Sequence, residues 1–380
     1  MPIFTEEQNM IRETIRKLCT EKIAKRAAEV DETKEYPWDL HQLFIEHDLF
    51  KIRVPAEYGG VPMDYTSCCI IVEELGRVDG ACANTVAHHQ AGLCCFMDGA
   101  SETQRQKYLP RIGQGNFLVG FALTEPNAGS DAFSLRTRAT AQGDRYVING
   151  SKCFISNAGL TDLYVLFTTV NPNLKREGIT AFLVEKDTPG LVIGKAENKM
   201  GLRASPTRQL TFEDMKVPKE NVLGGIGQGW ELMLQSLTET RILIAAMSLG
   251  IAQAAMEVAV AYARQREQFG QPIINFEGVS FMLADMAIQV ECTRSLIYQI
   301  AAMVDAGQRK QHYHASVAKC FAADTAMKVT TDAVQVLGGY GYTKEYPLEK
   351  MMRDAKAMQI VEGTNQIQRL QIARNLMKMY

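Results

Sequence analysis

The stretch Tyr146-Val-Ile-Asn-Gly-Ser-Lys-Cys-Phe-Ile155 interrupts a chain that otherwise has helical periodicity. Two short apolar runs flank Asn149-Gly150, a pair that supplies the positive φ angles of a type I′ turn. The pattern predicts a strand, a tight turn and a second strand. Further short apolar runs, bounded by Pro, Gly or Asn, extend this β region to 163–170, 180–184, 191–193 and 209–212.

Helical patterns lie on both sides of the β region. Thr5-Glu-Glu-Gln8 fits a capping box, and apolar residues then recur with a helical period. Long apolar stretches return at 230–264, 279–305 and 314–337. Because no βαβ alternation is present, a doubly wound nucleotide fold is unfavoured. The sequence predicts a mostly α protein with a helical domain at 1–118, a β domain at 119–225 and a second helical domain at 226–380.

Charge and composition exclude several classes of function. The 380 residues include 41 Lys and Arg and 43 Asp and Glu, a net charge of −2. Such a chain has no general cationic field for nucleic acid, so a polyanionic ligand needs local Arg, Lys or helix N-termini. The start resembles no signal peptide, and the apolar runs are shorter than a membrane span. We expect a cytoplasmic protein without a membrane span, whose nine Cys are reduced.

Metal and serine-hydrolase chemistry lack their usual motifs. The close histidine pairs, His88-His89 and His312/His314, have no carboxylate at metal-binding spacing, and the Cys have no zinc spacing. No G-x-S-x-G elbow is present. We therefore expect no metal site and no serine-hydrolase triad.

Glu362 is the carboxylate that the sequence singles out. It follows apolar Ile360 and Val361 and precedes a glycine and a new helical pattern. Burial there favours the protonated form of a carboxyl, which suits a general base that works near neutral pH. A solvated residue of an ordinary turn fits the same pattern, and the pattern alone favours that interpretation.

Seven motifs, in this order and spacing, make the sequence resemble the acyl-CoA dehydrogenases over essentially the whole chain. The resemblance implies an N-terminal helical domain, a central small β-barrel or sandwich, and a C-terminal four-helix bundle. The motifs are Leu123-Thr-Glu-Pro-Asn-Ala-Gly-Ser-Asp131, Asn149-Gly-Ser-Lys-Cys-Phe-Ile-Ser-Asn157, Lys199-Met-Gly-Leu-Arg-Ala-Ser205, Arg266-Glu-Gln-Phe-Gly270, Gln335-Val-Leu-Gly-Gly-Tyr-Gly-Tyr342, Met352-Arg-Asp-Ala-Lys356 and Glu362-Gly-Thr-Asn-Gln-Ile-Gln368.

The resemblance also implies a reaction. Members of the family bind FAD, oxidise acyl-CoA thioesters to enoyl-CoA and usually form homotetramers. Glu362 matches the base that removes the α-proton, and the β-hydride passes to flavin N5. The thioester oxygen is held by the backbone N–H of this glutamate and a flavin ribityl hydroxyl. Electrons then pass to an electron-transfer flavoprotein.

The same resemblance implies the binding residues. Substrate contacts fall on Ser130, Arg241, Val361 and Gly363. Some of the FAD contacts, at 266–268 and 335–339, match residues that reach the cofactor of a neighbouring subunit. The full FAD set is Phe121, Leu123, Thr124, Gly129, Ser130, Phe154, Ile155, Ser156, Arg266, Gln268, Phe269, Gln335, Val336, Gly338, Gly339, Thr364, Asn365 and Gln366.

Some positions depart from the family pattern. Val361 stands where Tyr is common and Ala91 where Leu is usual, so we expect a short, branched or alicyclic acyl group rather than a thin straight chain. Some relatives carry the base at the position of Thr240, and Glu239 is one residue away. Glu277 and Thr238 break expected cofactor and CoA contacts.

Three alternative functions remain open. The motifs do not determine the flavin potential or the access of oxygen, so an acyl-CoA oxidase and an enoyl-CoA reductase fit them equally well. A flavin-free helical scaffold is the alternative from another class. The intact Glu362 and the intact 123–131 segment argue against the scaffold.

Overall fold

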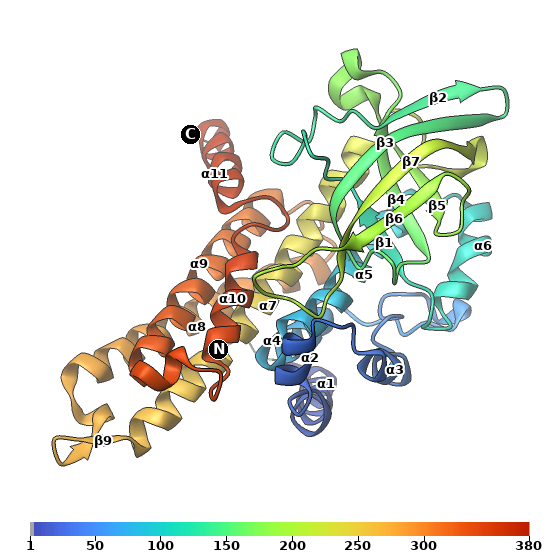
Figure 1. Cartoon of the computed structure of the whole chain (residues 1–380). Coiled ribbons are helices and arrows are strands. Elements are labelled where there is room, and N and C mark those ends of the chain that lie inside the picture. Colours follow the sequence, from blue (N-terminus) through green and yellow to red (C-terminus); the bar gives the residue numbers. More distant parts are fainter. Residues whose placement is uncertain (1–3, 380) are drawn as a thin grey trace.

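The computed structural model describes residues 4–379. Residues 1–3, which belong to the stretch on which the signal-peptide expectation rests, and Tyr380 lie outside the described residues. Figure 1 shows a helical, a β and a helical part in chain order. The predicted capping box is confirmed, because Thr5 and Gln8 each accept the other's backbone N–H. The N-terminal helices are α1 (Glu6–Leu18), α2 (Ala27–Thr33), α3 (Trp38–Glu46), α4 (Tyr65–Val78), α5 (Gly80–Gly99) and α6 (Glu102–Ile112).

One mixed sheet forms the β part. Its strand order is β6-β7-β3-β2-β4-β5-β8, and β1 lies parallel to β4. The pairings are mostly antiparallel, as expected for strands joined by short connections. The strands are β1 (Val119–Ala122), β2 (Arg138–Gln142), β3 (Arg145–Ser156), β4 (Leu163–Thr169), β5 (Ile179–Glu185), β6 (Leu191–Ala196), β7 (Thr207–Pro218) and β8 (Val222–Leu223).

Strand β4 is buried on both of its faces. Leu163, Val165 and Phe167 pack into a core shared with α5 and α6. Tyr164 and Leu166 point the other way, into a core shared with β3 and β7. A strand buried on both faces reads as a continuous apolar run, which is why this segment shows no alternation. Strand β4 therefore packs against helices on one face and against strands β3 and β7 of the same sheet on the other.

The hairpin predicted at Asn149-Gly150 is wrong. Strand β3 runs through these residues, and the turn between β2 and β3 lies at Gly143-Asp144. Asn149 instead exchanges two hydrogen bonds with Asp214 of β7, at 3.0 and 2.8 Å. Gly150 has a φ of 141° beside a break in the β3–β7 register. A Cβ there would lie 2.6 Å from Thr137 Cα, so the glycine serves a close backbone approach, not a turn.

This correction predicts different costs for two glycine substitutions. Gly150→Ala adds a clash with backbone to an unfavourable φ and should destabilise by about 3 kcal/mol. Gly143→Ala, with a φ of 62° and open space around it, should cost about 1 kcal/mol. Thermal unfolding of the two variants measures the difference, and equal losses would contradict the register described here.

The C-terminal helices pack around α7. Helices α8, α9 and α10, and α4 and α5 of the N-terminal part, all pack against α7. Figure 1 shows β9 at the tip of this bundle and α11 projecting from its other end, where α11 packs against α9. The bounds are α7 (Gly229–Gln265), β9 (Glu267–Gln268), β10 (Gln271–Pro272), α8 (Glu277–Asp305), α9 (His312–Leu337), α10 (Leu348–Met358) and α11 (Asn365–Met379).

Helix α7 is apolar enough and long enough to cross a membrane, which the shorter apolar runs in the sequence did not suggest. Within the described part of the chain it is alone in this respect, and 78% of its most apolar window is buried inside the protein. This burial is that of a core helix. The predicted helical, β, helical order is confirmed, with α7 joining the two helical parts.

Candidate active site

Glu362 lies in the turn between α10 and α11, and its carboxylate faces α5 and α7. The side chain is only 7% exposed. The hydroxyl of Thr240 donates to Glu362 Oε2 at 2.9 Å, and His88 Nε2 lies 3.8 Å from Oε1. The interpretation of Glu362 as a solvated turn residue is therefore wrong. The carboxylate is enclosed, and each of its oxygens faces a different polar side chain.

The backbone at Glu362 is held in a left-handed turn. Glu362 has a φ of 56° and Gly363 a φ of 87°. The Glu362 carbonyl accepts hydrogen bonds from Arg241 Nε at 3.1 Å and Gln368 Nε2 at 3.0 Å. The Gly363 carbonyl accepts from Gln368 Nε2 and from Lys319 Nζ, each at 2.9 Å. These donors stabilise a conformation that a non-glycine residue adopts only under constraint.

Two of these donors are buried cations. Desolvation lowers the pKa of Lys319 to about 7, although the nearby Glu362 carboxylate opposes the shift. Burial likewise lowers the pKa of Arg241, and Glu362 again opposes the shift. The Glu362 N–H itself finds no hydrogen-bond partner among residues 4–379. The turn therefore presents a carboxylate and a free backbone donor from one residue.

Glu239, the neighbouring candidate, lies in a separate cluster on α7. Its carboxylate is bound by Arg53 at 2.8 Å and by Arg309 at 2.5 Å. Burial raises the pKa of Glu239, but Arg53, Arg309 and the Cys94 thiol together lower it below its ordinary value. Glu239 is thus committed to ion pairs, whereas its neighbour Thr240 points to Glu362.

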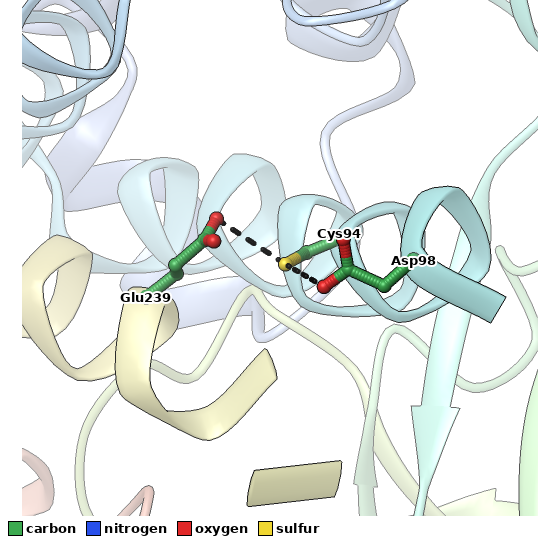
Figure 2. Close-up of side chains that lie close together, drawn as sticks. All are labelled: Cys94, Asp98 and Glu239. Atoms are coloured by element: carbon green, nitrogen blue, oxygen red, sulfur yellow. Dashed lines mark hydrogen bonds between the residues drawn. The ribbon is translucent and has the colours of Figure 1, made fainter. Parts of the chain in front are cut away.

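The same cluster has the composition of a metal site. Figure 2 shows the Cys94 sulfur between the carboxylates of Asp98 and Glu239, and the ligand atoms lie within 4.8 Å of one another. Metal ligation needs a thiolate, yet burial raises the pKa of Cys94 well above its usual value. Arg309 also binds Asp98, at 2.8 Å. Arginines already neutralise both carboxylates, which makes this cluster a poor metal site.

The two adjacent histidines of α5 have opposite environments. His89 Nε2 lies 2.6 Å from the Phe50 carbonyl, and its Nδ1 accepts the Val119 N–H at 3.0 Å. These partners require the neutral ring with the proton on Nε2. Burial lowers the pKa of His89 to about 4. His88 instead places Nδ1 3.2 Å from the Asn84 carbonyl and Nε2 toward Glu362.

His89 predicts a loss of stability in acid. Its pKa is about 4 when folded and 6.5 as the ordinary value, so the unfolded chain binds more protons between these values. The stabilisation is complete above pH 6.5 and falls by about 3 kcal/mol as the pH drops to 4. Thermal unfolding of His89→Gln, which cannot titrate, should show a flatter pH dependence over this window. An unchanged slope would contradict the assignment.

The predicted flavin-lining segments meet beside strand β3. The Thr124 carbonyl accepts the Cys153 N–H at 2.8 Å. Buried Lys152 donates to the Leu123 carbonyl at 2.8 Å and to Glu125 Oε1 at 2.7 Å. Glu125 also accepts the backbone N–H groups of residues 136 and 137. These contacts hold the 121–130 segment against strand β3.

Strand β3 ends in an irregular stretch that exposes an aromatic ring. Phe154 has a φ of 56° at a register shift, and its side chain is 67% exposed, while Ile155 beside it is buried. Irregularities of this kind re-aim a side chain near functional sites. Gly129 and Ser130 are exposed, and no atom of residues 4–379 lies within 4 Å of a Cβ at Gly129. Ser156, the last residue of β3, is half-buried.

A second group of predicted FAD residues lies at the far end of α7. Arg266, Gln268, Val336, Gly338 and Gly339 line one open cavity of about 500 Å³. Within the part of the chain that the structure describes, no atom lies within 4 Å of a Cβ at either glycine, so the glycines leave this cavity open. Exposed Phe269 and Gln335 lie beside it in the chain. Arg266 follows the end of α7, which lies 24 residues beyond Arg241, or about 36 Å along the helix.

The remaining predicted FAD residues begin α11. Asn365 is buried, and its amide contacts Lys319, the Cys320 carbonyl and Asp324 of α9. Its side chain therefore ties α11 to α9 rather than facing outward, while Gln366 is exposed and Thr364 half-buried. Lys319 and Gln368 were missed as site residues. A lone Lys in the apolar stretch 315–326 was the available signal for the first.

Three domain models identify the family. The models of the acyl-CoA dehydrogenase N-terminal, middle and C-terminal domains match residues 5–116, 120–215 and 227–377. The chain belongs to the acyl-CoA dehydrogenase family, and it is an oxidoreductase of that class.

Individual relatives agree with this result. The cyclohex-1-ene-1-carbonyl-CoA dehydrogenase of Geobacter metallireducens is 45% identical over 378 residues, which cover 99% of this chain and 100% of the relative. The butyryl-CoA dehydrogenase of Megasphaera elsdenii has a TM-score of 0.96 at 39% identity, over 99% and 100% of the two chains. A chain solved in work on the electron transferring flavoprotein of Acidaminococcus fermentans has a TM-score of 0.96 at 42% identity, over 99% of each chain.

Proposed function

We propose that this protein is an FAD-dependent acyl-CoA dehydrogenase in which Glu362 removes the α-proton of an acyl-CoA thioester. The observation that carries the proposal is the enclosed turn, which offers a carboxylate and an unpartnered backbone N–H from the same residue. An α-proton is too weakly acidic for a carboxylate unless the enolate oxygen is stabilised. The Glu362 N–H supplies one such donor close to the base.

The surrounding residues orient this base. Thr240 holds Glu362 Oε2 and leaves Oε1 for the proton, while Arg241, Lys319 and Gln368 fix the two carbonyls of the turn. A base held in this way does not lose rotamer freedom during the reaction, which is an advantage of preorganisation. Burial also excludes water, so that the carboxylate is weakly solvated.

The residues present fit FAD at two places. The exposed ring of Phe154 and the open loop at Gly129-Ser130 offer a surface and backbone donors near the sheet. The cavity with Arg266 and its two glycines offers a cation and close backbone approach for phosphates. When bound, FAD supplies the acceptor for the β-hydride of the substrate.

These two places support a homotetramer. Arg266 follows the end of α7, which lies about 36 Å beyond Arg241 along the helix, so we assign the residues of the far cavity to the FAD of another copy, as the family resemblance implies. Exposed Phe269, Phe281 and Ile288 near this end of the molecule give the helical part an apolar surface for such contacts. We place the enzyme in the cytoplasm, with an electron-transfer flavoprotein as its partner. The relation to a chain solved in work on such a flavoprotein supports that acceptor.

We predict that Glu362→Gln still binds FAD and acyl-CoA but reduces the flavin at least ~100-fold more slowly, because general-base removal typically costs that much. Anaerobic bleaching of the yellow flavin by substrate measures the rate. Full retention of the bleaching rate would place the base elsewhere, and Glu239→Gln then tests whether the neighbouring carboxylate is the base.

The same protein separates the alternative functions. A colourless protein that takes up no FAD would favour the scaffold alternative, and rapid reoxidation of the flavin by oxygen would favour an oxidase.

We further propose an alicyclic or branched acyl group as the substrate. Ala91 is buried on α5 one turn after His88, and His88 lies beside Glu362. Because residues three apart on a helix share a face, we infer that a larger side chain at 91 narrows the acyl site. Val361 precedes the base and packs against the core. The name of the Geobacter relative, which refers to a six-membered ring, favours the same class.

A panel of straight, branched, alicyclic and aryl-alkyl acyl-CoAs tests this substrate class. We expect the alicyclic thioesters to bleach the flavin fastest. Ala91→Leu should slow bleaching by the alicyclic thioesters about tenfold and leave the rate with straight chains unchanged, because one methylene group that does not fit a pocket changes the rate by at least about that factor. Preferential bleaching by butyryl-CoA, the substrate named for the Megasphaera neighbour, would overturn the proposal.

A further inference from the structure

The carboxylate of Glu362 has a titratable neighbour that its role as base does not explain. His88 Nε2 lies 3.8 Å from Glu362 Oε1, whereas the Thr240 hydroxyl donates to the other carboxylate oxygen. His88 belongs to α5, and Glu362 to the turn between α10 and α11. Its ring is 14% exposed, against 7% for the glutamate.

The hydrogen bonds of His88 determine which nitrogen faces the base. A carbonyl oxygen only accepts, so the contact of Nδ1 with the Asn84 carbonyl at 3.2 Å requires the proton on Nδ1. The neutral ring then presents a lone pair at Nε2. That lone pair faces Oε1, the oxygen of Glu362 that Thr240 leaves available.

We propose that His88 is a second proton carrier, which receives at Nε2 the proton that Glu362 has removed from the substrate. The O–H bond at Oε1 breaks as the N–H bond at Nε2 forms, which gives an imidazolium beside a regenerated carboxylate. No electrons move in this step. The separation of 3.8 Å closes by about 1 Å, or is bridged by a water molecule, before transfer. The more exposed ring then releases the proton to solvent.

This proposal rests on the function proposed above for Glu362. Other charged groups also face the carboxylate, namely Arg241 from α7 and Lys319 from α9. Arginine does not titrate in the working range. Lys319 does, so the experiment has to separate its ionisation from that of His88.

The first test is the pH dependence of steady-state turnover in the FAD-loaded full-length enzyme, with an artificial electron acceptor, because each new cycle needs the carboxylate of Glu362 to be regenerated. His88→Gln should slow turnover about tenfold or more and remove one ionisation from the profile. Lys319→Arg keeps a cation that does not titrate, and the His88 ionisation should persist in this background. His89→Gln removes the neighbouring imidazole, whose nitrogens are both occupied, and should keep the wild-type profile.

Chemical rescue gives a readout that a structural role would not move. Added imidazole should restore turnover in His88→Ala, whereas pyrazole, a ring of the same size and far weaker basicity, should not. This variant serves equally if His88→Gln fails to bind FAD. Wild-type rate and profile in His88→Gln, or equal effects of the two azoles, would overturn the proposal. Failure of wild-type enzyme to bleach with any acyl-CoA would instead refute the proposed function itself.

Discussion

The site depends on the hydrogen bonds that converge on two adjacent carbonyl groups, those of Glu362 and Gly363. Arg241, Lys319 and Gln368 donate to them from three different helices. Without these donors the left-handed backbone at a glutamate is unfavourable by about 1 to 3 kcal/mol. The same contacts connect α11, α9 and α7, so the orientation of the base and the packing of the helical part are one constraint.

Helix α7 carries this constraint through the molecule. Three successive residues of α7 have different partners. Glu239 pairs with arginines, Thr240 donates to the carboxylate of Glu362, and Arg241 donates to the Glu362 carbonyl. The other end of α7 reaches the cavity at Arg266, about 36 Å away. A single rigid helix therefore sets the distance between the base and the residues that we assign to a neighbouring copy.

Much of the fold was predictable because it rests on local patterns. The helical, β, helical order follows from periodicity, and the Thr5/Gln8 capping box from four residues. The hairpin turn predicted at Asn149-Gly150 was wrong because the turn signal is local. Gly150 is instead required by the close approach of Thr137, which belongs to a different segment of the chain. β4 gave no alternation because it is buried on both faces.

The candidate site was predictable only in part, for the same reason. Glu362 is visible in its motif, but its enclosure depends on His88 and Thr240, which are 274 and 122 residues away in sequence. Asn365 was expected at the cofactor, yet its amide is used entirely against α9. Side-chain direction at a helix start is decided by packing, which a motif does not contain.

A structure of the FAD-loaded protein with a bound acyl-CoA tests the central claim most directly. The account predicts Glu362 Oε1 about 3 to 3.5 Å from the α-carbon, the range of a near-attack geometry, with the Glu362 N–H on the thioester oxygen. A thioester bound with its α-carbon against another carboxylate, or with Glu362 turned away, would contradict it.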